Sequence, residues 1–126
     1  MTWRTLGTNK ETVEAYMDAY AKWDHEGVLR CLTDDIEWIV PGAFHLRGKE
    51  AFDKEIEGEG NPRPPQISVD RMVEEDDIVV AEGQVRQPIA DGTHVDLAYC
   101  DVFRLRDGKI FHLTSYLMRV ENQSLL

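Results

Sequence analysis

One aspartate in an otherwise apolar strand pattern is the residue of this chain best suited to chemistry. Residues 97–105 alternate in polarity. The side chains on the same face as Asp101 are those of Leu97, Tyr99, Phe103 and Leu105. An unpaired buried carboxylate is costly, so such a group takes up a proton or finds a hydrogen-bond donor. A neutral carboxyl can donate to an oxyanion, so Asp101 predicts a site. The alternative is a buried acid bonded to Tyr16 or to backbone donors for structure alone.

A second candidate group is His45, which follows the turn sequence Pro41-Gly42. An imidazole titrates near neutral pH, so His45 could move a proton at the mouth of a pocket. The alternative is a loop histidine that faces water. His94 and His112 could join Asp96 in a metal site. The strand pairing favoured below separates them, so we expect no metal and no other cofactor.

The elements that position these groups follow from hydrophobic spacing. Thr8 and Glu11 form a capping box, and the apolar stripe after it predicts a helix to about Trp23. Asp24 can cap a short second helix. Further expected elements are a strand over 36–40, a helix over 48–56, a loop over 58–65, and strands over 66–74, 78–87, 93–105 and 109–120. Helices first and hairpins after predict one α+β domain, residues 1–126, with helices on one face of a curved antiparallel sheet.

The pairing of the last two strands depends on the turn at Asp107-Gly108. A two-residue turn would pair Asp101 with Thr114. A three-residue loop over 106–108 pairs Asp101 with Leu113 instead. Only the second pairing gathers the apolar side chains on one face, so we expect the three-residue loop.

Charged residues of the third helix and the following loop, Glu55 and Glu57 among them, are interpreted as a solvated face. Glu37 is expected to point away from the pocket by alternation from Trp38, unless a bulge turns it inward. The pattern leaves open whether the loop 58–65 closes over a pocket.

Composition restricts the class of protein. The chain has 126 residues, of which 42% are hydrophobic and 30% charged, as is typical of one soluble globular domain. A formal net charge of −10 argues against a nucleic-acid or anionic-membrane partner. Cys31 and Cys100 match no metal-ligand spacing and are expected to be reduced thiols. Since no signal-peptide or membrane-span pattern occurs, we expect a cytoplasmic protein.

A series of short motifs occurs in an order typical of one superfamily. The motifs are Asp-x-x-Gly at 24–27, the run 34–42 around Trp38, Arg-Gly-Lys-Glu-Ala at 47–51, and the run 102–110. Over about Thr8 to Val120 the chain resembles the SnoaL-like and ketosteroid-isomerase-like branch of the nuclear transport factor 2-like superfamily. The resemblance implies a cone-shaped α+β barrel, in which a curved sheet wraps around about three N-terminal helices and an apolar pocket. It also implies a homodimer that packs through the outer sheet face, around Ala98, Cys100 and Val102.

The ketosteroid-isomerase pattern carries over in part. Tyr16 falls where that family keeps its oxyanion-hole tyrosine, and Asp101 falls where it keeps a protonated aspartic acid. Val40 occupies the position of the general base and cannot accept a proton, so ordinary ketosteroid isomerisation is not expected. The limonene-epoxide-hydrolase pattern also breaks, because Tyr99 stands where that pattern has an arginine.

These features lead to three hypotheses. The first is an enzyme of isomerase, cyclase or lyase type for a hydrophobic, carbonyl-bearing small molecule. Tyr16 and Asp101 would donate hydrogen bonds, and His45 or a substrate group would move the proton. The expected ligand-binding residues are Tyr20, Trp38, Val40, Tyr99, Phe103, Leu113 and Ser115. The second, motivated by Val40, is a non-catalytic binding protein for an apolar molecule. The third is a dimeric interaction module with a vestigial pocket.

Overall fold

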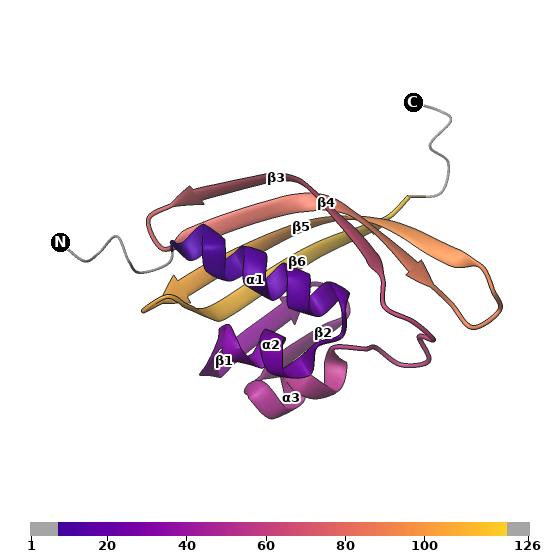
Figure 1. Ribbon diagram of the computed structural model, residues 1–126, viewed down its shortest axis with the longest axis horizontal. Helices are drawn as coiled ribbons and strands as arrows, with labels where there is room; N and C mark the ends of the chain where they lie inside the picture. The colour runs from indigo at the N-terminus through magenta and orange to yellow at the C-terminus, as the bar shows by residue number, and fades with distance from the viewer. Residues whose placement is uncertain (1–7, 121–126) are drawn as a thin grey trace.

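The computed structural model describes residues 8–120, which form three helices and six strands (Figure 1). The elements are α1 (Asn9–Ala21), α2 (His25–Arg30), β1 (Leu32–Val40), β2 (Phe44–Arg47), α3 (Lys49–Glu55), β3 (Gln66–Glu75), β4 (Ile78–Pro88), β5 (His94–Arg106) and β6 (Lys109–Arg119). The expected α+β class is confirmed. No helix in this described range is long and apolar enough to cross a membrane.

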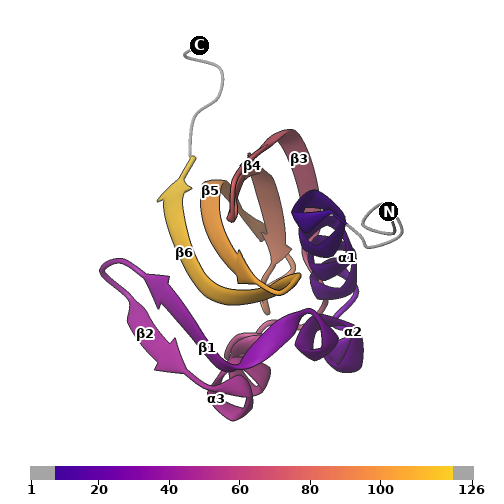
Figure 2. The ribbon, with the colours of Figure 1, turned by 90° about the vertical axis from the view of Figure 1, so that its left-hand side faces the viewer.

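The six strands form one curved sheet in the order β2-β1-β6-β5-β4-β3. Figure 2 shows that β6, β5, β4 and β3 bend around α1, while the β1–β2 hairpin continues the sheet toward α3. The sheet does not close, so β2 and β3 are its edges. Neighbouring strands are antiparallel except β1 and β6, which run parallel. Hairpin signals could not reveal this pair, because no tight turn joins a parallel pair.

Helix α1 begins as the capping box predicts. The Thr8 hydroxyl accepts a hydrogen bond from the Glu11 amide at 3.1 Å, and the Glu11 carboxylate accepts one from the Thr8 amide at 2.8 Å. The helix buries Val13, Tyr16 and Met17 against the inner face of the sheet. One side of α1 therefore faces the concave side of the sheet, and Tyr16 is part of that side.

The predicted three-residue loop between β5 and β6 is wrong. Asp107 and Gly108 both have positive φ, at 53° and 78°, which is the conformation of a two-residue type I′ turn. A bulge between Arg104 and Leu105 then leaves Phe111 as an extra residue in β6, so Asp101 pairs with Ser115 and not with Leu113. The true pairing differs from the predicted one by two residues. Because side chains alternate with a period of two, the predicted faces of both strands still hold.

The segment around His45, which was expected to be a loop, forms the strand β2. It is antiparallel to β1, with Val40 opposite Phe44 and Ile39 opposite His45. A strand of four residues is too short to show a clear alternation in the sequence. The hairpin turns Phe44 inward and His45 outward, because directly paired residues share a face.

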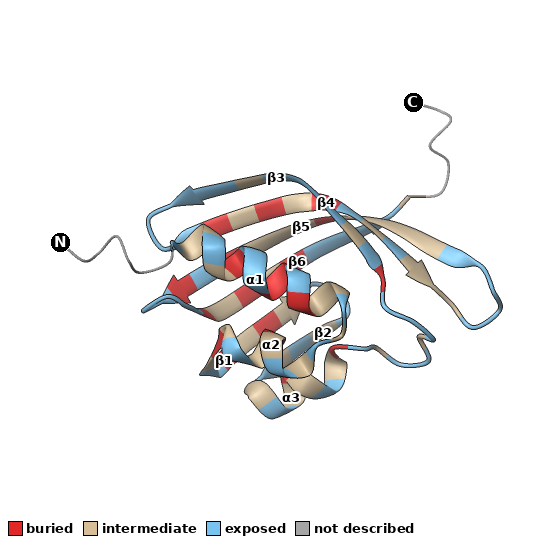
Figure 3. Cartoon of the chain, in the orientation of Figure 1, coloured by how far each residue is buried: buried red, intermediate tan, exposed pale blue. Residues whose placement is uncertain are grey.

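The core lies between the three helices and the inner face of the sheet, as the buried residues in Figure 3 show. Phe103 and Leu113 are fully buried in the middle of the sheet, and Phe52 of α3 stacks on Trp38 with ring centroids 4.5 Å apart. Cys31 and Cys100 are free thiols. Leu105 and Ile110 are buried next to the β5–β6 turn, and a cavity lies beside the C-terminal half of α1.

Candidate functional site

A cavity of about 280 Å³ lies between α1, the C-terminal end of α3, the loop 58–65 and the inner face of the sheet. Most of its wall is apolar, and the aliphatic and proline side chains there are Val40, Ile56, Pro65, Ile67, Val85, Leu97 and Leu117. The polar groups at its buried end are those of Tyr16 and Ser115, which are buried, and of Asp101, which keeps some exposed surface. Leu117, in contrast, is 48% exposed, so the cavity reaches solvent on that side. An apolar wall with a few convergent polar groups is the usual form of a small-molecule site.

Asp101 is the acid at the buried end of this cavity. Burial raises the pKa of its carboxyl to about 7, and a hydrogen bond from Ser115 opposes that rise. The Ser115 hydroxyl accepts a hydrogen bond from the Trp38 indole Nε1 at 3.0 Å, which leaves its own hydrogen for Asp101. At neutral pH the carboxyl is therefore populated both as a neutral hydrogen-bond donor and as a carboxylate.

Two tyrosines of α1 line the cavity beside Asp101. Burial raises the pKa of Tyr16 well above its ordinary value, and the charges of Tyr20 and Asp101 add to the effect. The pKa of Tyr20 is also raised, first by burial and then by Asp101 and Glu55. The Tyr16 ring packs edge-on against Phe103, with centroids 5.5 Å apart. Both phenols therefore keep their protons at neutral pH and can serve as hydrogen-bond donors.

Tyr99 forms part of the cavity wall, and its hydroxyl donates a hydrogen bond within the protein. It lies opposite Gly83 of β4 and reaches across that residue to donate a hydrogen bond to the Ser68 carbonyl of β3, at 2.8 Å. A Cβ atom on Gly83 would lie only 2.0 Å from that carbonyl oxygen. The absence of a side chain at Gly83 is therefore what allows Tyr99 to link β5 to β3.

Seven of the predicted site residues line the cavity, namely Tyr16, Tyr20, Trp38, Val40, Tyr99, Asp101 and Ser115. Phe103 and Leu113, which were expected to bind ligand, are fully buried outside the cavity lining. His45, which was expected to move a proton, points to the outer face of the sheet. Its Nε2 atom lies 3.0 Å from the Glu37 carboxylate. A strand alternates its faces, so neither His45 nor Glu37 can contact a molecule in this cavity.

The cavity is also lined by residues that the sequence did not assign to the site, and those from α3, the loop after it and β4 include Glu55, Glu57, Asn61, Pro65 and Gln87. Two side-chain hydrogen bonds hold the loop 58–65 in place. The side-chain amide of Asn61 donates to the backbone carbonyl of Glu57 at 2.9 Å, and the side-chain amide of Gln87 donates to the backbone carbonyl of Arg63 at 3.0 Å. Glu55 lies three residues after the buried Phe52, so helical spacing was the signal for its inward position. Glu55 is therefore more than part of a solvated face, because it is half-buried and lines the cavity, whereas Glu57 is exposed at the edge of the cavity.

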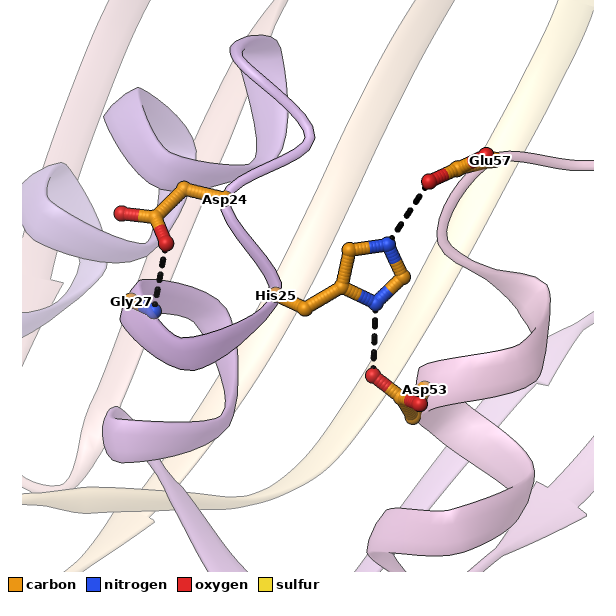
Figure 4. Close-up of polar contacts among 5 residues, drawn as sticks. All are labelled: Asp24, His25, Gly27, Asp53 and Glu57. Atoms are coloured by element: carbon orange, nitrogen blue, oxygen red, sulfur yellow. Dashed lines mark hydrogen bonds and ion pairs between the residues drawn. The ribbon is translucent and has the colours of Figure 1, made fainter.

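His25 connects α2 to α3 beneath the loop (Figure 4). Its Nδ1 atom lies 2.6 Å from the Asp53 carboxylate and its Nε2 atom 2.8 Å from that of Glu57. These two hydrogen bonds raise the pKa of His25 above its ordinary 6.5. Glu57 is therefore held in an ion pair at the edge of the cavity.

His25→Gln is expected to destabilise the protein at pH 6 and to have little effect at pH 9. A raised pKa in the folded state means that the stabilisation is complete below about 6.5. It is lost as the pH rises through the folded-state pKa. Exposed ion pairs contribute about 0.2–1 kcal/mol each, so the loss at pH 6 should stay below about 2 kcal/mol. Urea unfolding at both pH values measures it, and an equal loss at both would contradict the assignment.

The histidines considered for a metal site lie apart. His112 pairs with Arg104, whereas His94 lies opposite Pro88 at the far end of β5. Within residues 8–120 no three His, Cys, Asp or Glu side chains form a cluster that could hold a metal ion.

Comparison with solved structures places this architecture among known folds. An NTF2-like protein of unknown function from Burkholderia pseudomallei K96243 aligns with a TM-score of 0.80 and 19% identity, covering 90% of this chain and 92% of that one. An LEH-like epoxide hydrolase from M. tuberculosis aligns with a TM-score of 0.78 and 21% identity, covering 87% and 82%. TerC co-crystallised with polyporic acid aligns with a TM-score of 0.76 and 21% identity, covering 85% and 88%. At these identities the likeness shows the fold alone.

The sequence comparisons add the family. No curated protein matches the chain. The family model described as the SnoaL-like domain matches residues 13–113, from the first turns of α1 to the middle of β6. That match covers Tyr16, Asp101 and most of the cavity wall. By sequence and by fold, the chain belongs to the SnoaL-like domain family of the NTF2-like superfamily.

Proposed function

We propose that the protein is an enzyme of isomerase, cyclase or lyase type that acts on a hydrophobic, carbonyl-bearing small molecule. The observation that carries the proposal is the pair of donors at the buried end of an apolar cavity. Tyr16 keeps its proton, and the pKa of Asp101 is about 7, so that a neutral carboxyl is available near neutral pH. Two such donors suit an oxygen that gains negative charge during a reaction.

The mechanism follows from where these groups lie. A ligand carbonyl at the buried end would accept hydrogen bonds from Tyr16 and from neutral Asp101. As electrons move onto the oxygen, both bonds strengthen, and the low dielectric of the apolar wall increases their effect. Trp38 and Ser115 orient Asp101 through the chain of hydrogen bonds described above. Removing one preorganised donor of this kind typically lowers kcat about 10²–10³-fold.

The structural neighbours support a small-molecule role without identifying the substrate. One of them is an epoxide hydrolase, and another was crystallised with polyporic acid. Both share the fold of this chain. A ligand that enters this cavity must tolerate the carboxylates of Glu55 and Glu57 in its wall.

A panel of ligands tests the proposal. Steroids, phenols, aromatic polyketides and terpenoid epoxides are titrated while tryptophan fluorescence is followed, since Trp38 forms part of the cavity wall. Every mixture is then analysed by mass spectrometry and chromatography. We expect saturable binding of a carbonyl compound together with conversion to an isomer, a cyclised product or a cleavage product. Absence of binding by every class would contradict the proposal.

A second candidate function is non-catalytic binding of an apolar small molecule. The observation that favours it is Val40, which lines the cavity at the position where ketosteroid isomerases carry their base. This candidate predicts saturable binding with no conversion of any ligand in the same panel.

We also propose that two copies of the chain associate through the outer sheet face. Tyr116 and Met118 of β6 are 53% and 70% exposed there, and Val73 of β3 is 51% exposed. Apolar side chains exposed along one sheet face are typical of an interface. Light scattering should give twice the mass of one chain for the wild type and the mass of one chain for Met118→Glu. A monomeric wild type at high concentration would contradict the interface.

A further inference from the structure

The cavity wall contains the carboxylate of Glu55, at the end of α3. Within residues 8–120 no basic side chain pairs with Glu55, although its neighbours are paired. Lys54 pairs with Glu50, and His25 pairs with both Asp53 and Glu57. Glu55 is half-buried and lines the cavity. The ion pairs along α3 therefore engage the other acids and leave Glu55 available to a ligand.

Glu55 and Asp101 both line the cavity, and so does Tyr20 of α1. The charge of Glu55 raises the pKa of Tyr20, and Asp101 raises the pKa of that phenol more strongly. One tyrosine on α1 thus lies within electrostatic reach of both acids. Burial raises the pKa of Asp101 and provides a neutral donor, whereas Glu55 lines the cavity from the end of α3. Two acids in one site can have different roles, one donating a hydrogen bond in its neutral form and the other accepting a proton as a carboxylate.

We propose that Glu55 is the proton acceptor of the reaction assigned above, and this role rests on that proposed function. The Glu55 carboxylate takes a proton from the carbon next to the ligand carbonyl. The electron pair of the broken C–H bond forms a C=C bond, and the carbonyl π electrons move to the oxygen, where Tyr16 and Asp101 donate. Return of the proton from Glu55 to the same or a conjugated carbon restores both the carbonyl and the carboxylate. No oxidant, reductant or cofactor is consumed.

The proposal also explains how the site can work although Val40 stands at the family's base position. The acceptor would come from α3, on the wall that also contains Ile56, instead of from β1. His45 on β2 cannot supply it, because that side chain lies on the other face of the sheet. The substrate class is thereby narrowed to carbonyl compounds that carry an acidic C–H bond next to the carbonyl.

Hydrogen–deuterium exchange of a simple ketone tests the role. The probe is 2-tetralone in D₂O, and ¹H NMR follows the loss of its C–H signals next to the carbonyl. We expect the wild type to accelerate exchange over buffer and Glu55→Gln to reduce that acceleration about 10²–10⁴-fold. Glu55→Asp should restore part of the rate. Glu50→Gln removes the same charge from the same helix outside the cavity and should exchange at the wild-type rate.

The outcomes separate this role from the proposed function. If Glu55→Gln exchanges as fast as the wild type while Asp101→Asn is slow, Glu55 is not the acceptor and the donor pair stands. If the wild type exchanges 2-tetralone no faster than buffer, the proposed enzymatic function fails, and the role of Glu55 fails with it. Loss of exchange in Glu50→Gln equal to that in Glu55→Gln would also overturn the role, because the effect would then be one of general charge. Circular dichroism and the unfolding midpoint show that each variant is folded.

Discussion

Asp101→Asn is expected to lose most of the turnover and, above pH 8, to be more stable than the wild type. The pKa of Asp101 is raised from its ordinary value near 3.8 to about 7, because burial penalises the carboxylate. Below about pH 4 the group is neutral in both the folded and the unfolded chain. Between about pH 4 and pH 7 the unfolded chain ionises this group while the folded protein keeps it protonated, so stability is lost across that range and stays low above it. The difference in pKa corresponds to at most about 4 kcal/mol, which the asparagine variant avoids.

Asparagine keeps the shape of the side chain and can still interact with Ser115. We therefore expect a gain of about 2–4 kcal/mol at pH 9 and almost none at pH 4, measured by urea unfolding. Turnover should fall about 10²–10³-fold. Asp96→Asn is the matched control, since its ion pair with Arg86 lowers the pKa of Asp96, and its removal should not stabilise at pH 9. A less stable Asp101→Asn at pH 9 would indicate a structural acid and contradict the site.

Gly83→Ala is expected to destabilise the protein by about 2–3 kcal/mol, because overpacking of this size forces a backbone shift. The added Cβ atom would lie 2.0 Å from the Ser68 carbonyl oxygen and 3.0 Å from the Tyr99 hydroxyl. The backbone carbonyl of Ser68 cannot move away from the added Cβ atom as easily as the end of a flexible side chain could. The pairing of β3 with β4 must therefore open at this point, and the hydrogen bond from Tyr99 to Ser68 is lost with it.

Tyr99→Phe provides the comparison for Gly83→Ala. It removes only the hydrogen bond, so it should cost about 1 kcal/mol. In the double variant the two losses should not add, because the alanine already breaks that bond. The unfolding free energies of all three variants test this account. A Gly83→Ala protein as stable as the wild type would contradict the close approach of β3 to β4.

The sequence identified residues that line the cavity, Tyr16 and Asp101 among them, because alternation and helix spacing are local properties. Asp101 was recognised from the apolar face around it, and Tyr16 from the stripe of α1 together with the family resemblance. The predicted strand pairing was wrong by two residues, since the bulge between Arg104 and Leu105 leaves no signal in the sequence. The assignment of side chains to the inner and outer faces of β5 and β6 stayed correct, because a shift of two residues leaves every side chain on its own face.

The remainder of the site depends on contacts between distant segments. Glu55 and Glu57 were interpreted as solvated because their neighbours are charged, yet α3 and the loop after it fold back over the cavity. His45 was placed near the cavity because the short strand β2 was not expected. The two hydrogen-bond partners of His25, Asp53 and Glu57, lie 28 and 32 residues after it in the sequence. No local pattern could reveal contacts over such separations.

The measurement that tests the central claim most directly is the pKa of Asp101 itself. Side-chain carboxyl ¹³C chemical shifts of the wild type are followed from pH 3 to pH 9, and Asp101→Asn identifies the signal by its loss. The account predicts a midpoint at about 7. It also predicts that a bound carbonyl compound raises the midpoint further, because such a ligand prefers the neutral donor. A midpoint near 3.8, the ordinary value for an aspartate, would mean that Asp101 is a carboxylate at neutral pH and would contradict its role as a donor.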